Sequence, residues 1–255
     1  MEELDRREFL KKCCAAGGAV FAIVHLPGSQ AEQTAPAEGT AYDAAQHDYG
    51  MGVDISKCIG CGRCMDACKT ENDVPRDEHF VRTWVERYVI QVDGETTVQA
   101  IDPNAEPAAE SRLSEKGILR TFFVPKLCNH CENAPCVQVC PVGATFTSPD
   151  GVVLVDRDYC IGCRYCIQAC PYGARFLHPV THTAEKCTFC YHRLVKGLQP
   201  ACVEVCPTGA RIFGDLTARN SPLVRFTRFN EIQVLKDHLN TEPRVYYANL
   251  DREVS

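Results

Sequence analysis

Strand-like alternation of side chains marks residues 80–101, where apolar or β-branched positions alternate with polar or aromatic ones. A period of two places successive side chains on opposite faces of a β-strand. The turn pair Asp93-Gly94 interrupts the alternation, and strand-like composition resumes at Thr96. The pattern therefore predicts a β-hairpin.

Shorter segments predict further elements. Strand-like composition occurs at residues 51–55, 119–124, 151–155 and 244–247. Ser221-Pro222 predicts the start of a helix, because serine caps a helix and proline is tolerated in its first turn. Ile232, Leu235 and Leu239 would share one face of a helix in this C-terminal region. We therefore expect residues 216–255 to form an extension with a helix and a strand.

The first 31 residues have the pattern of an export signal. Arg6-Arg7 is followed by Phe-Leu-Lys, as in twin-arginine signals, and by an apolar run at 13–26. Small residues then precede an expected cleavage point after Ala31. A buried amphipathic helix is the alternative. Residues 32–48 show little periodicity and predict a linker, and no segment approaches the ~20 apolar residues of a membrane span.

The cysteine content is the most informative feature of the composition. The chain of 255 residues has 18 cysteines, and all but Cys13 and Cys14 fall into four groups of four. The formal net charge of −6 argues against nucleic-acid binding, which usually requires a basic face. The groups are run one (Cys58, Cys61, Cys64, Cys68), run two (Cys128, Cys131, Cys136, Cys140), run three (Cys160, Cys163, Cys166, Cys170) and run four (Cys187, Cys190, Cys202, Cys206).

Run three has the spacing of a cluster-binding loop. Its first three cysteines are three residues apart, the fourth follows four residues later, and Pro171 closes the run. Iron–sulfur clusters are held by four thiolates, and in two-cluster ferredoxins the cysteine before the proline ligates the other cluster. Run three therefore predicts a partner run. Run one has the same spacing, but Lys69 stands where proline is expected.

Three segments that begin with Cys-Pro repeat one another. The motif Cys-Pro-x-Gly-Ala opens the segments 140–146, 170–176 and 206–212. Internal repetition of this kind indicates duplicated structural units. The sequence therefore predicts repeated ferredoxin units rather than isolated metal sites.

Other uses of the cysteines are less consistent with the spacing. Structural zinc sites use separated Cys-x-x-Cys pairs, whereas a third cysteine directly follows the pair in runs one and three. Disulfides are the stronger alternative, because exported cysteine-rich chains usually contain them. A radical enzyme using S-adenosylmethionine needs only a three-cysteine motif and would not require sixteen ligands.

With these runs, the chain resembles the four-cluster ferredoxin subunits of molybdopterin-type and related respiratory complexes. This family includes the nitrite-reductase-associated ferredoxin subunit and the beta subunits of polysulfide, tetrathionate and dimethyl sulfoxide reductases. The resemblance covers nearly everything from Tyr49 to Tyr247 and includes the segments 175–181 and 200–207.

The resemblance implies an α+β fold with two pseudo-symmetric modules like bacterial ferredoxins, an inserted β-hairpin and a C-terminal extension. Residues 49–79 and 180–215, with runs one and four, would form one module. Residues 125–179, with runs two and three, would form the other, and residues 80–124 would be a β-rich insertion.

The resemblance also implies four [4Fe–4S] clusters with crossed ligation. All sixteen positions are cysteine, so no three-iron cluster is expected. The implied ligand sets are Cys58, Cys61, Cys64 with Cys206; Cys187, Cys190, Cys202 with Cys68; Cys128, Cys131, Cys136 with Cys170; and Cys160, Cys163, Cys166 with Cys140.

The implied function is electron transfer without catalysis by this chain itself. The expected partners are an integral-membrane quinone-handling subunit and a molybdopterin-type or multihaem cytochrome subunit. The chain would be exported folded by the twin-arginine route and would act at the periplasmic face, peripheral to the membrane. A disulfide-stapled exported binding protein and a self-contained redox enzyme are the alternatives.

Residues beside the ligands could adjust the cluster potentials. An apolar shell is expected from Ile59, Ile161, Val137 and Val205, and charge from Lys69, Arg63, Arg164, Arg175 and Lys186. His130, between two cysteines of run two, is expected beside the cluster or in solvent rather than as a ligand.

Overall fold

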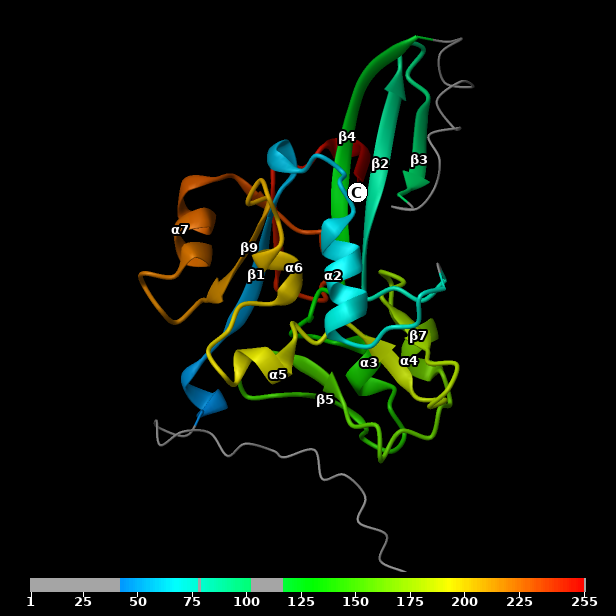
Figure 1. The fold of residues 1–255 in the computed structure, drawn as a ribbon, viewed down its shortest axis with the longest axis vertical. Helices are drawn as coiled ribbons and strands as arrows, with labels where there is room; N and C mark the ends of the chain where they lie inside the picture. Colours follow the sequence, from blue (N-terminus) through cyan, green and yellow to red (C-terminus); the bar gives the residue numbers. More distant parts are fainter. Residues whose placement is uncertain (1–41, 78, 102–116, 255) are drawn as a thin grey trace, which may run out of the picture. The chain divides into compact units, whose positions relative to one another are not determined.

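The computed structural model describes residues 42–77, 79–101 and 117–254, and residues 42–255 cluster as one compact unit. The predicted export signal and residues 32–41 of the predicted linker lie outside the described residues. The described part mixes short helices with four small sheets, which confirms the predicted α+β class (Figure 1).

A four-stranded sheet joins the two ends of the described chain. Its order is β10 (Ile232–Gln233), β11 (Val245–Ala248), β1 (Tyr49–Asp54) and β9 (Arg211–Asp215). Strand β1 pairs parallel with β11 and antiparallel with β9. Helix α7 (Pro222–Phe229) packs against β1 and β9, and starts where Ser221-Pro222 predicted it.

A close contact fixes one residue of β1. A Cβ atom at Gly52 would lie 2.6 Å from the ring of Phe226 on α7. The glycine therefore allows the helix to pack directly on the strand, since any side chain there would displace the ring.

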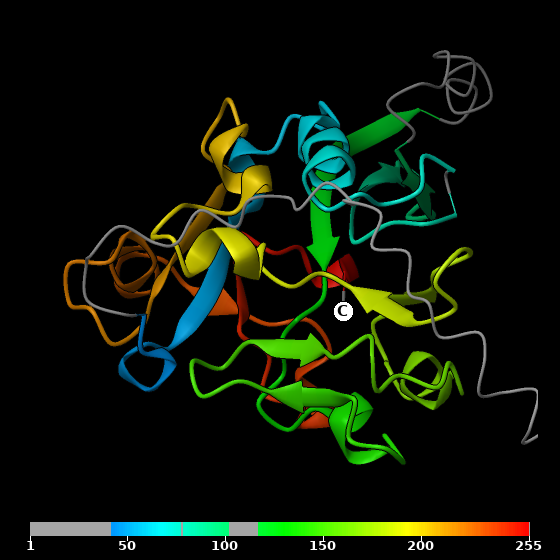
Figure 2. The same cartoon turned by 60° about the horizontal axis from the view of Figure 1, so that its bottom comes forward.

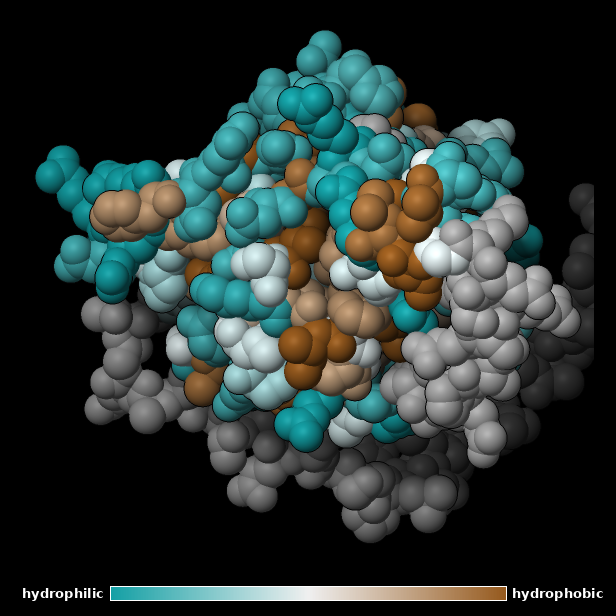
Figure 3. All heavy atoms as spheres, turned by 90° about the horizontal axis from the view of Figure 1, so that it is seen from above, coloured by the Kyte–Doolittle hydropathy of each residue, from teal (hydrophilic) through white to brown (hydrophobic). Residues whose placement is uncertain are grey.

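The predicted insertion forms a three-stranded sheet. Strands β2 (Thr83–Gln91) and β3 (Thr96–Ala100) make the predicted hairpin, and β4 (Ile118–Leu127) pairs with the other edge of β2. Strand β4 contains the strand predicted at 119–124 and continues to Leu127. The insertion projects beyond the rest of the unit (Figure 1). Apolar side chains lie among polar ones on this end of the unit (Figure 3).

Two short hairpins and five short helices form the segments around the cysteine runs. Hairpin β5 (Thr145–Thr147) with β6 (Val153–Val155) follows run two, and β7 (Arg175–Leu177) with β8 (Ala184–Lys186) follows run three. Helix α2 packs against α6, and α3 packs against α4 (Figures 1 and 2). The helices are α2 (Arg63–Glu71), α3 (Pro135–Gln138), α4 (Tyr165–Gln168), α5 (Tyr191–Leu194) and α6 (Ala201–Glu204).

Residues 42–48 belong to the predicted linker, yet they pack onto the folded unit. The rings of Tyr42, His47 and Tyr49 stack in sequence with centroids 5.3 Å apart at each step, and Tyr49 stacks on Phe213 at 5.4 Å. Aromatic stacking needs no periodic sequence pattern, so the alternation of side chains could not reveal this contact.

The C-terminal region contains one wrong prediction. Ile232, Leu235 and Leu239 do not share a helix, because α7 ends at Phe229 and Asn230 is extended. Ile232 lies in β10 and Leu239 in a 3₁₀ turn (Asp237–Leu239). Lys236, with φ of 51°, precedes that turn in the left-handed region, which interrupts an α-helix. The predicted strand at 244–247 is confirmed as β11.

The main core lies between these sheets and includes cysteines from the runs. Its largest fully buried members include Met51, Val53, Leu127, Phe189 and Tyr247, with Cys128, Cys187 and Cys202 beside them.

Among the described residues, no helix is long and apolar enough to cross a membrane.

Candidate metal centres

Three cavities are each lined by four cysteines. Each cavity takes its cysteines from two separate runs. Site A is lined by Cys58, Cys61, Cys64 and Cys206; site B by Cys68, Cys187, Cys190 and Cys202; site C by Cys128, Cys131, Cys136 and Cys170.

Site D denotes the fourth implied set, Cys140, Cys160, Cys163 and Cys166. Cys166 is buried in a small apolar cluster with Cys160 packed against it, and α4, which carries Cys166, packs against α3. Cys140 follows α3 at the end of run two. Cys163 is exposed, so site D lies at the surface.

The arrangement suits a cluster rather than a single ion. Within the described ranges, no group of three His, Cys, Asp or Glu side chains could hold one metal ion. Tetrahedral zinc with ~2.3 Å bonds needs sulfur atoms roughly 3.8 Å apart, whereas a cluster separates its thiolates by the irons between them. All sixteen cysteines of the runs are free thiols, so the structure gives the disulfide alternative no support.

The three Cys-Pro segments form the same turn, which explains their repetition. Gly143, Gly173 and Gly209 have φ of 68°, 64° and 64°. Each donates its N–H to the carbonyl of the cysteine three residues earlier, at 3.4, 3.4 and 3.3 Å. Positive φ explains why glycine recurs in the motif.

These turns direct backbone N–H groups at sulfur. Thr145 donates its N–H to Sγ of Cys140 at 3.4 Å. Burial raises the pKa of the Cys140 thiol, but the N–H groups of Thr145 and its neighbours lower it, and the net pKa lies below the usual value. The same opposition leaves the pKa of Cys206 lowered. The turns therefore stabilise a thiolate ligand.

Cys68 is the exception among the last cysteines of the runs. Helix α2 continues past it to Glu71, since Lys69 replaces the expected proline. Asn72 then follows the helix, and its side-chain Nδ2 lies 3.7 Å from Sγ of Cys68 and 3.5 Å from Sγ of Cys190. Burial raises the pKa of Cys68 to about 12, so its thiolate depends on a bound cation.

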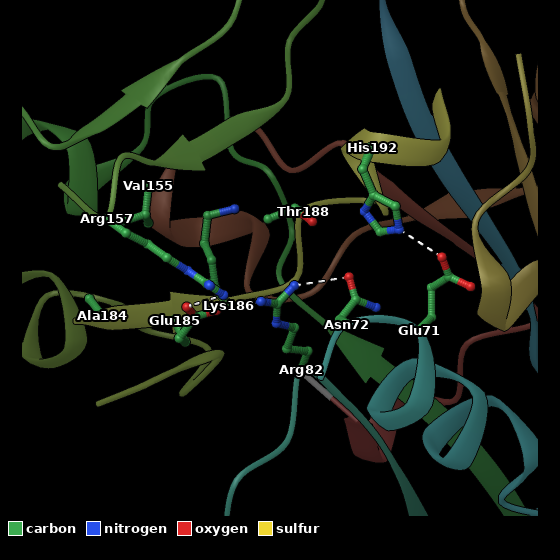
Figure 4. Close-up of a pocket in the computed structure, with 10 residues that line it drawn as sticks. All are labelled: Glu71, Asn72, Arg82, Val155, Arg157, Ala184, Glu185, Lys186, Thr188 and His192. Carbon is green, nitrogen blue, oxygen red and sulfur yellow. Dashed lines mark hydrogen bonds and ion pairs between the residues drawn. The ribbon is translucent and has the colours of Figure 1, made fainter. Parts of the chain in front are cut away.

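A polar pocket beside site B holds Asn72 in place (Figure 4). The Oδ1 atom of Asn72 accepts a hydrogen bond from Nη1 of Arg82 at 3.0 Å, and Nη2 of Arg82 donates to Glu185. Arg157 pairs with the other oxygen of Glu185 at 2.7 Å. Sequence reasoning missed Asn72, although the absent proline at position 69 was a signal.

Three cations next to ligands are buried. Arg175, Lys186 and Arg211 are 5%, 1% and 3% exposed. Burial lowers the pKa of Arg175 and Arg211, but nearby thiolates raise it more, whereas burial leaves that of Lys186 lowered. Sequence reasoning missed Arg211, although the repeat places it where Arg175 stands.

The other basic residues expected near ligands lie at the surface. Arg63 and Arg164 are exposed, and Nζ of half-buried Lys69 donates to the carbonyl of Asp77 at 2.7 Å. Water therefore screens Arg63 and Arg164.

Most of the expected apolar shell is exposed, and the structure excludes the solvent-facing alternative for His130. Ile59, Ile161 and Val205 are 58%, 65% and 37% exposed, although Ile59 also lines the cavity of site A. His130 is fully buried and stacks on Phe189 with centroids 3.7 Å apart. Burial holds its pKa well below the usual value, so the ring is neutral.

Comparison with known proteins agrees with this geometry. Residues 57–144 and 119–216 each match a family described as a 4Fe–4S dicluster domain. The B subunit of tetrathionate reductase from Salmonella typhimurium is 44% identical over 208 residues, covering 81% of this chain and 74% of that protein.

Two further relatives are similar to this chain over most of its length. Protein NrfC of Escherichia coli K12 is 39% identical over 245 residues, covering 95% of this chain and 94% of that protein. The B subunit of polysulfide reductase from Wolinella succinogenes is 38% identical over 199 residues, covering 78% of this chain and 92% of that protein. The present chain therefore belongs to this family of 4Fe–4S iron–sulfur subunits of reductase complexes, and it is an electron-transfer subunit rather than a catalytic one.

Proposed function

We propose that this chain holds four [4Fe–4S] clusters and relays single electrons through them. The observation that best supports this proposal is that three cavities are each lined by four cysteines from two runs. The clusters would supply one-electron oxidation and reduction when bound. The chain's own residues separate the sites, bury them and direct N–H donors at their sulfurs.

The proposed ligands are the four sets defined as sites A to D, and they divide between two ferredoxin-like modules. Residues 49–79 with 180–215 would hold sites A and B, and residues 125–179 would hold sites C and D. The packing of α2 on α6 and of α3 on α4 supports this division.

Matched backbone contacts also support the two modules. Asp54 and Asp156 each precede the first cysteine of a run by four residues. The N–H of Asp54 donates to the carbonyl of Ala210 at 2.8 Å, and that of Asp156 to Ala144 at 2.7 Å. Ala144 and Ala210 occupy the same position of the Cys-Pro-x-Gly-Ala motif.

Sites A and D would be the ends of the relay. Cys61 of site A and Cys163 of site D are exposed, whereas the cysteines of site B are all buried. Ile59 and Ile161, each beside one of these ends, are exposed apolar residues that a partner subunit could cover. Electrons would enter at one end and leave at the other.

The proposed partners are an integral-membrane quinone-interacting subunit and a molybdopterin-type or multihaem catalytic subunit. The relatives named as parts of tetrathionate and polysulfide reductases support a place in a respiratory reductase. The Arg6-Arg7 pattern supports export of the folded, cluster-loaded chain to the periplasmic face of the membrane.

Purification of the tagged full chain from solubilised membranes tests this function. We expect a brown complex with a multi-span subunit and a cofactor-bearing catalytic subunit, whose cluster absorbance bleaches on addition of a quinol or of the reduced catalytic substrate. A colourless chain recovered alone, with its cysteines oxidised in pairs, would contradict the proposal and favour the disulfide alternative.

A further inference from the structure

Two buried arginines occupy equivalent places in the repeats. Arg175 lies five residues after Cys170 and begins β7, and Arg211 lies five residues after Cys206 and begins β9. Both are at least nine-tenths buried. The third repeat has Thr145 at this position. The repeats therefore supply one buried arginine to each proposed module.

Arg175 reaches ligands of two different sites. Its Nη2 donates to Sγ of Cys136 in site C at 3.0 Å, and the thiolate of Cys166 in site D lies near enough to raise the pKa of the guanidinium. Nη1 donates to the hydroxyl of Thr145 at 3.3 Å, and Nε has no partner among the described atoms. The guanidinium therefore lies between sites C and D.

Arg211 makes the corresponding pair of contacts in the other module. Its Nη1 lies 3.9 Å from Sγ of Cys202 in site B, and the thiolate of Cys64 in site A lies near enough to raise the pKa of the guanidinium. Nη2 donates to the hydroxyl of Thr83 at 2.7 Å. Arg211 also lines the cavity of site A. This guanidinium therefore lies between sites A and B.

We infer that Arg175 and Arg211 are positioning residues, each placing one permanent positive charge between two neighbouring clusters and raising the reduction potential of both. This inference rests on the proposed occupancy of sites A to D by [4Fe–4S] clusters. It explains why one buried arginine lies beside the third cysteine of two runs in each module.

The physical basis is the fixed charge of arginine in a dry site. A guanidinium stays protonated in proteins, so its charge does not depend on pH. Four thiolates leave a bound cluster net negative, and reduction adds one more negative charge. A nearby buried cation therefore favours the reduced form, and interior charges interact more strongly than exposed ones. One cation between two clusters also lowers the repulsion that arises when both are reduced.

The gap between the modules also contains a basic side chain. Nζ of Lys186 donates to the carbonyls of Cys187, in site B, and of Val153, which lines site C. The contacts give the order D, Arg175, C, Lys186, B, Arg211, A. This order places the two exposed sites at the ends, as electron relay requires.

Redox titration of the purified complex, followed by EPR, tests the inference. Arg175→Gln and Arg211→Gln should each lower the midpoint potentials of two clusters, and the two affected pairs should not overlap. We expect at least a tenfold change in the equilibrium constant of each affected couple, which is 59 mV for one electron. Iron content is measured on every variant.

Two exposed arginines provide matched controls. Arg164→Gln lies next to Cys163 in site D, and Arg63→Gln lies next to Cys64 in site A. Both side chains are exposed, so their shifts should stay well below tenfold. Arg175→Lys and Arg211→Lys keep the charge, and should lower the same pairs of potentials by less than the glutamine variants do.

Several outcomes would overturn the inference. These are unchanged potentials in glutamine variants that retain all their iron, shifts of a single cluster, or overlapping pairs. If the glutamine variants lose iron, the lysine variants decide: unshifted potentials in iron-complete lysine variants would assign the arginines a purely structural role. Absence of four clusters from the unmodified chain would instead defeat the proposed function.

Discussion

Cys68 and Cys140 hold the same place in their runs, but the backbone after each of them differs. Cys140 is followed by proline, and the turn directs the N–H of Thr145 at its sulfur. Cys68 is followed by Lys69, and helix α2 continues to Glu71. The side chain of Asn72 then supplies the donor to sulfur.

The difference shows that one requirement is met by two kinds of donor. A sulfur that ligates iron is stabilised by N–H groups, and their source can be the backbone or a side chain. A backbone donor survives any side-chain substitution, whereas the amide of Asn72 can be removed. A single side-chain substitution can therefore remove the donor that follows Cys68, whereas the backbone donor that follows Cys140 does not depend on the side chain that carries it.

Removal of Cys68 or Cys140 should have the largest effect on cluster content, and each removal should affect a different site. Cys68→Ala is expected to damage only the cluster of site B, and Cys140→Ala only that of site D. Each should lose between one and four of about sixteen irons per chain. EPR should show that different signals disappear. Loss of the same signal in both variants would refute the crossed ligation.

The loops of sites A and D each contain a glycine with a positive φ, but the two glycines differ in what surrounds them. Gly60 and Gly162 both have φ of about 68°. A Cβ at Gly162 would lie 2.4 Å from the backbone carbonyl of His182, whereas one at Gly60 would meet the movable ring of Phe123 at 2.6 Å. Gly162→Ala should therefore prevent assembly of site D.

Gly60→Ala is the matched variant for this test. It should cost roughly 1–2 kcal/mol, the usual cost of left-handed backbone for an L-residue, and keep its iron. Iron content and urea unfolding check both variants. Full iron in Gly162→Ala with loss of iron in Gly60→Ala would reverse the expected order.

Asp54 and Asp156 are the carboxylates that precede runs one and three, and they differ in burial and hydrogen bonding. Asp54 is buried and accepts from the Ser56 hydroxyl at 2.6 Å and from Asn249 at 3.1 Å, whereas half-buried Asp156 accepts from the N–H of Asp158 at 2.9 Å. Asp54→Ala should cost about 2 kcal/mol of unfolding free energy at pH 7, and Asp156→Ala less than half as much.

The pH dependence of the Asp54 effect has a definite sign. Burial raises the pKa of Asp54, but its hydrogen bonds to Ser56 and Asn249 and the Lys57 charge lower it, and the folded pKa is below the unfolded one. Its contribution is therefore complete above about pH 4 and is lost as the pH falls through the folded pKa. Urea unfolding of the unmodified chain and Asp54→Ala should differ equally at pH 8 and pH 5. A difference that halves between these values would contradict the assignment.

Asn72→Leu should have the smallest of these effects, and it should change the reduction potential of the site B cluster alone. Loss of the N–H donor should lower the potential of the site B cluster by about 30 mV, half a decade in its equilibrium constant. Asn230→Leu is the control, since both asparagines donate to the carbonyl four residues earlier at a helix end, at 3.0 and 2.9 Å. Both variants should lose about 1 kcal/mol of stability. Equal potentials in Asn72→Leu and the control would exclude the proposed donor role.

Local patterns predicted the local elements. Alternation and the Asp93-Gly94 turn identified the hairpin of β2 and β3, and Ser221-Pro222 identified the start of α7. The apolar spacing of Ile232 and Leu239 was misleading, because left-handed residues and pairing of β10 with β11 outweigh helical periodicity there.

Contacts between distant segments were less accessible from sequence. Cysteine spacing and the Cys-Pro repeats pointed to cluster chemistry, but the exposure of Ile59 and the burial of His130 depend on the fold around the loops. Arg211 and Asn72 were missed because cysteine spacing identifies ligands, whereas the packing of the fold decides which other side chains reach sulfur.

Iron and acid-labile sulfide analysis of the full chain, combined with EPR of the reduced protein, decides whether all four sites hold clusters. We expect four [4Fe–4S] clusters, with about sixteen irons and as many sulfides per chain. We also expect no three-iron signal in undamaged protein. An iron content clearly below that value in fully loaded chains, or an intrinsic three-iron signal, would contradict the four-cluster proposal.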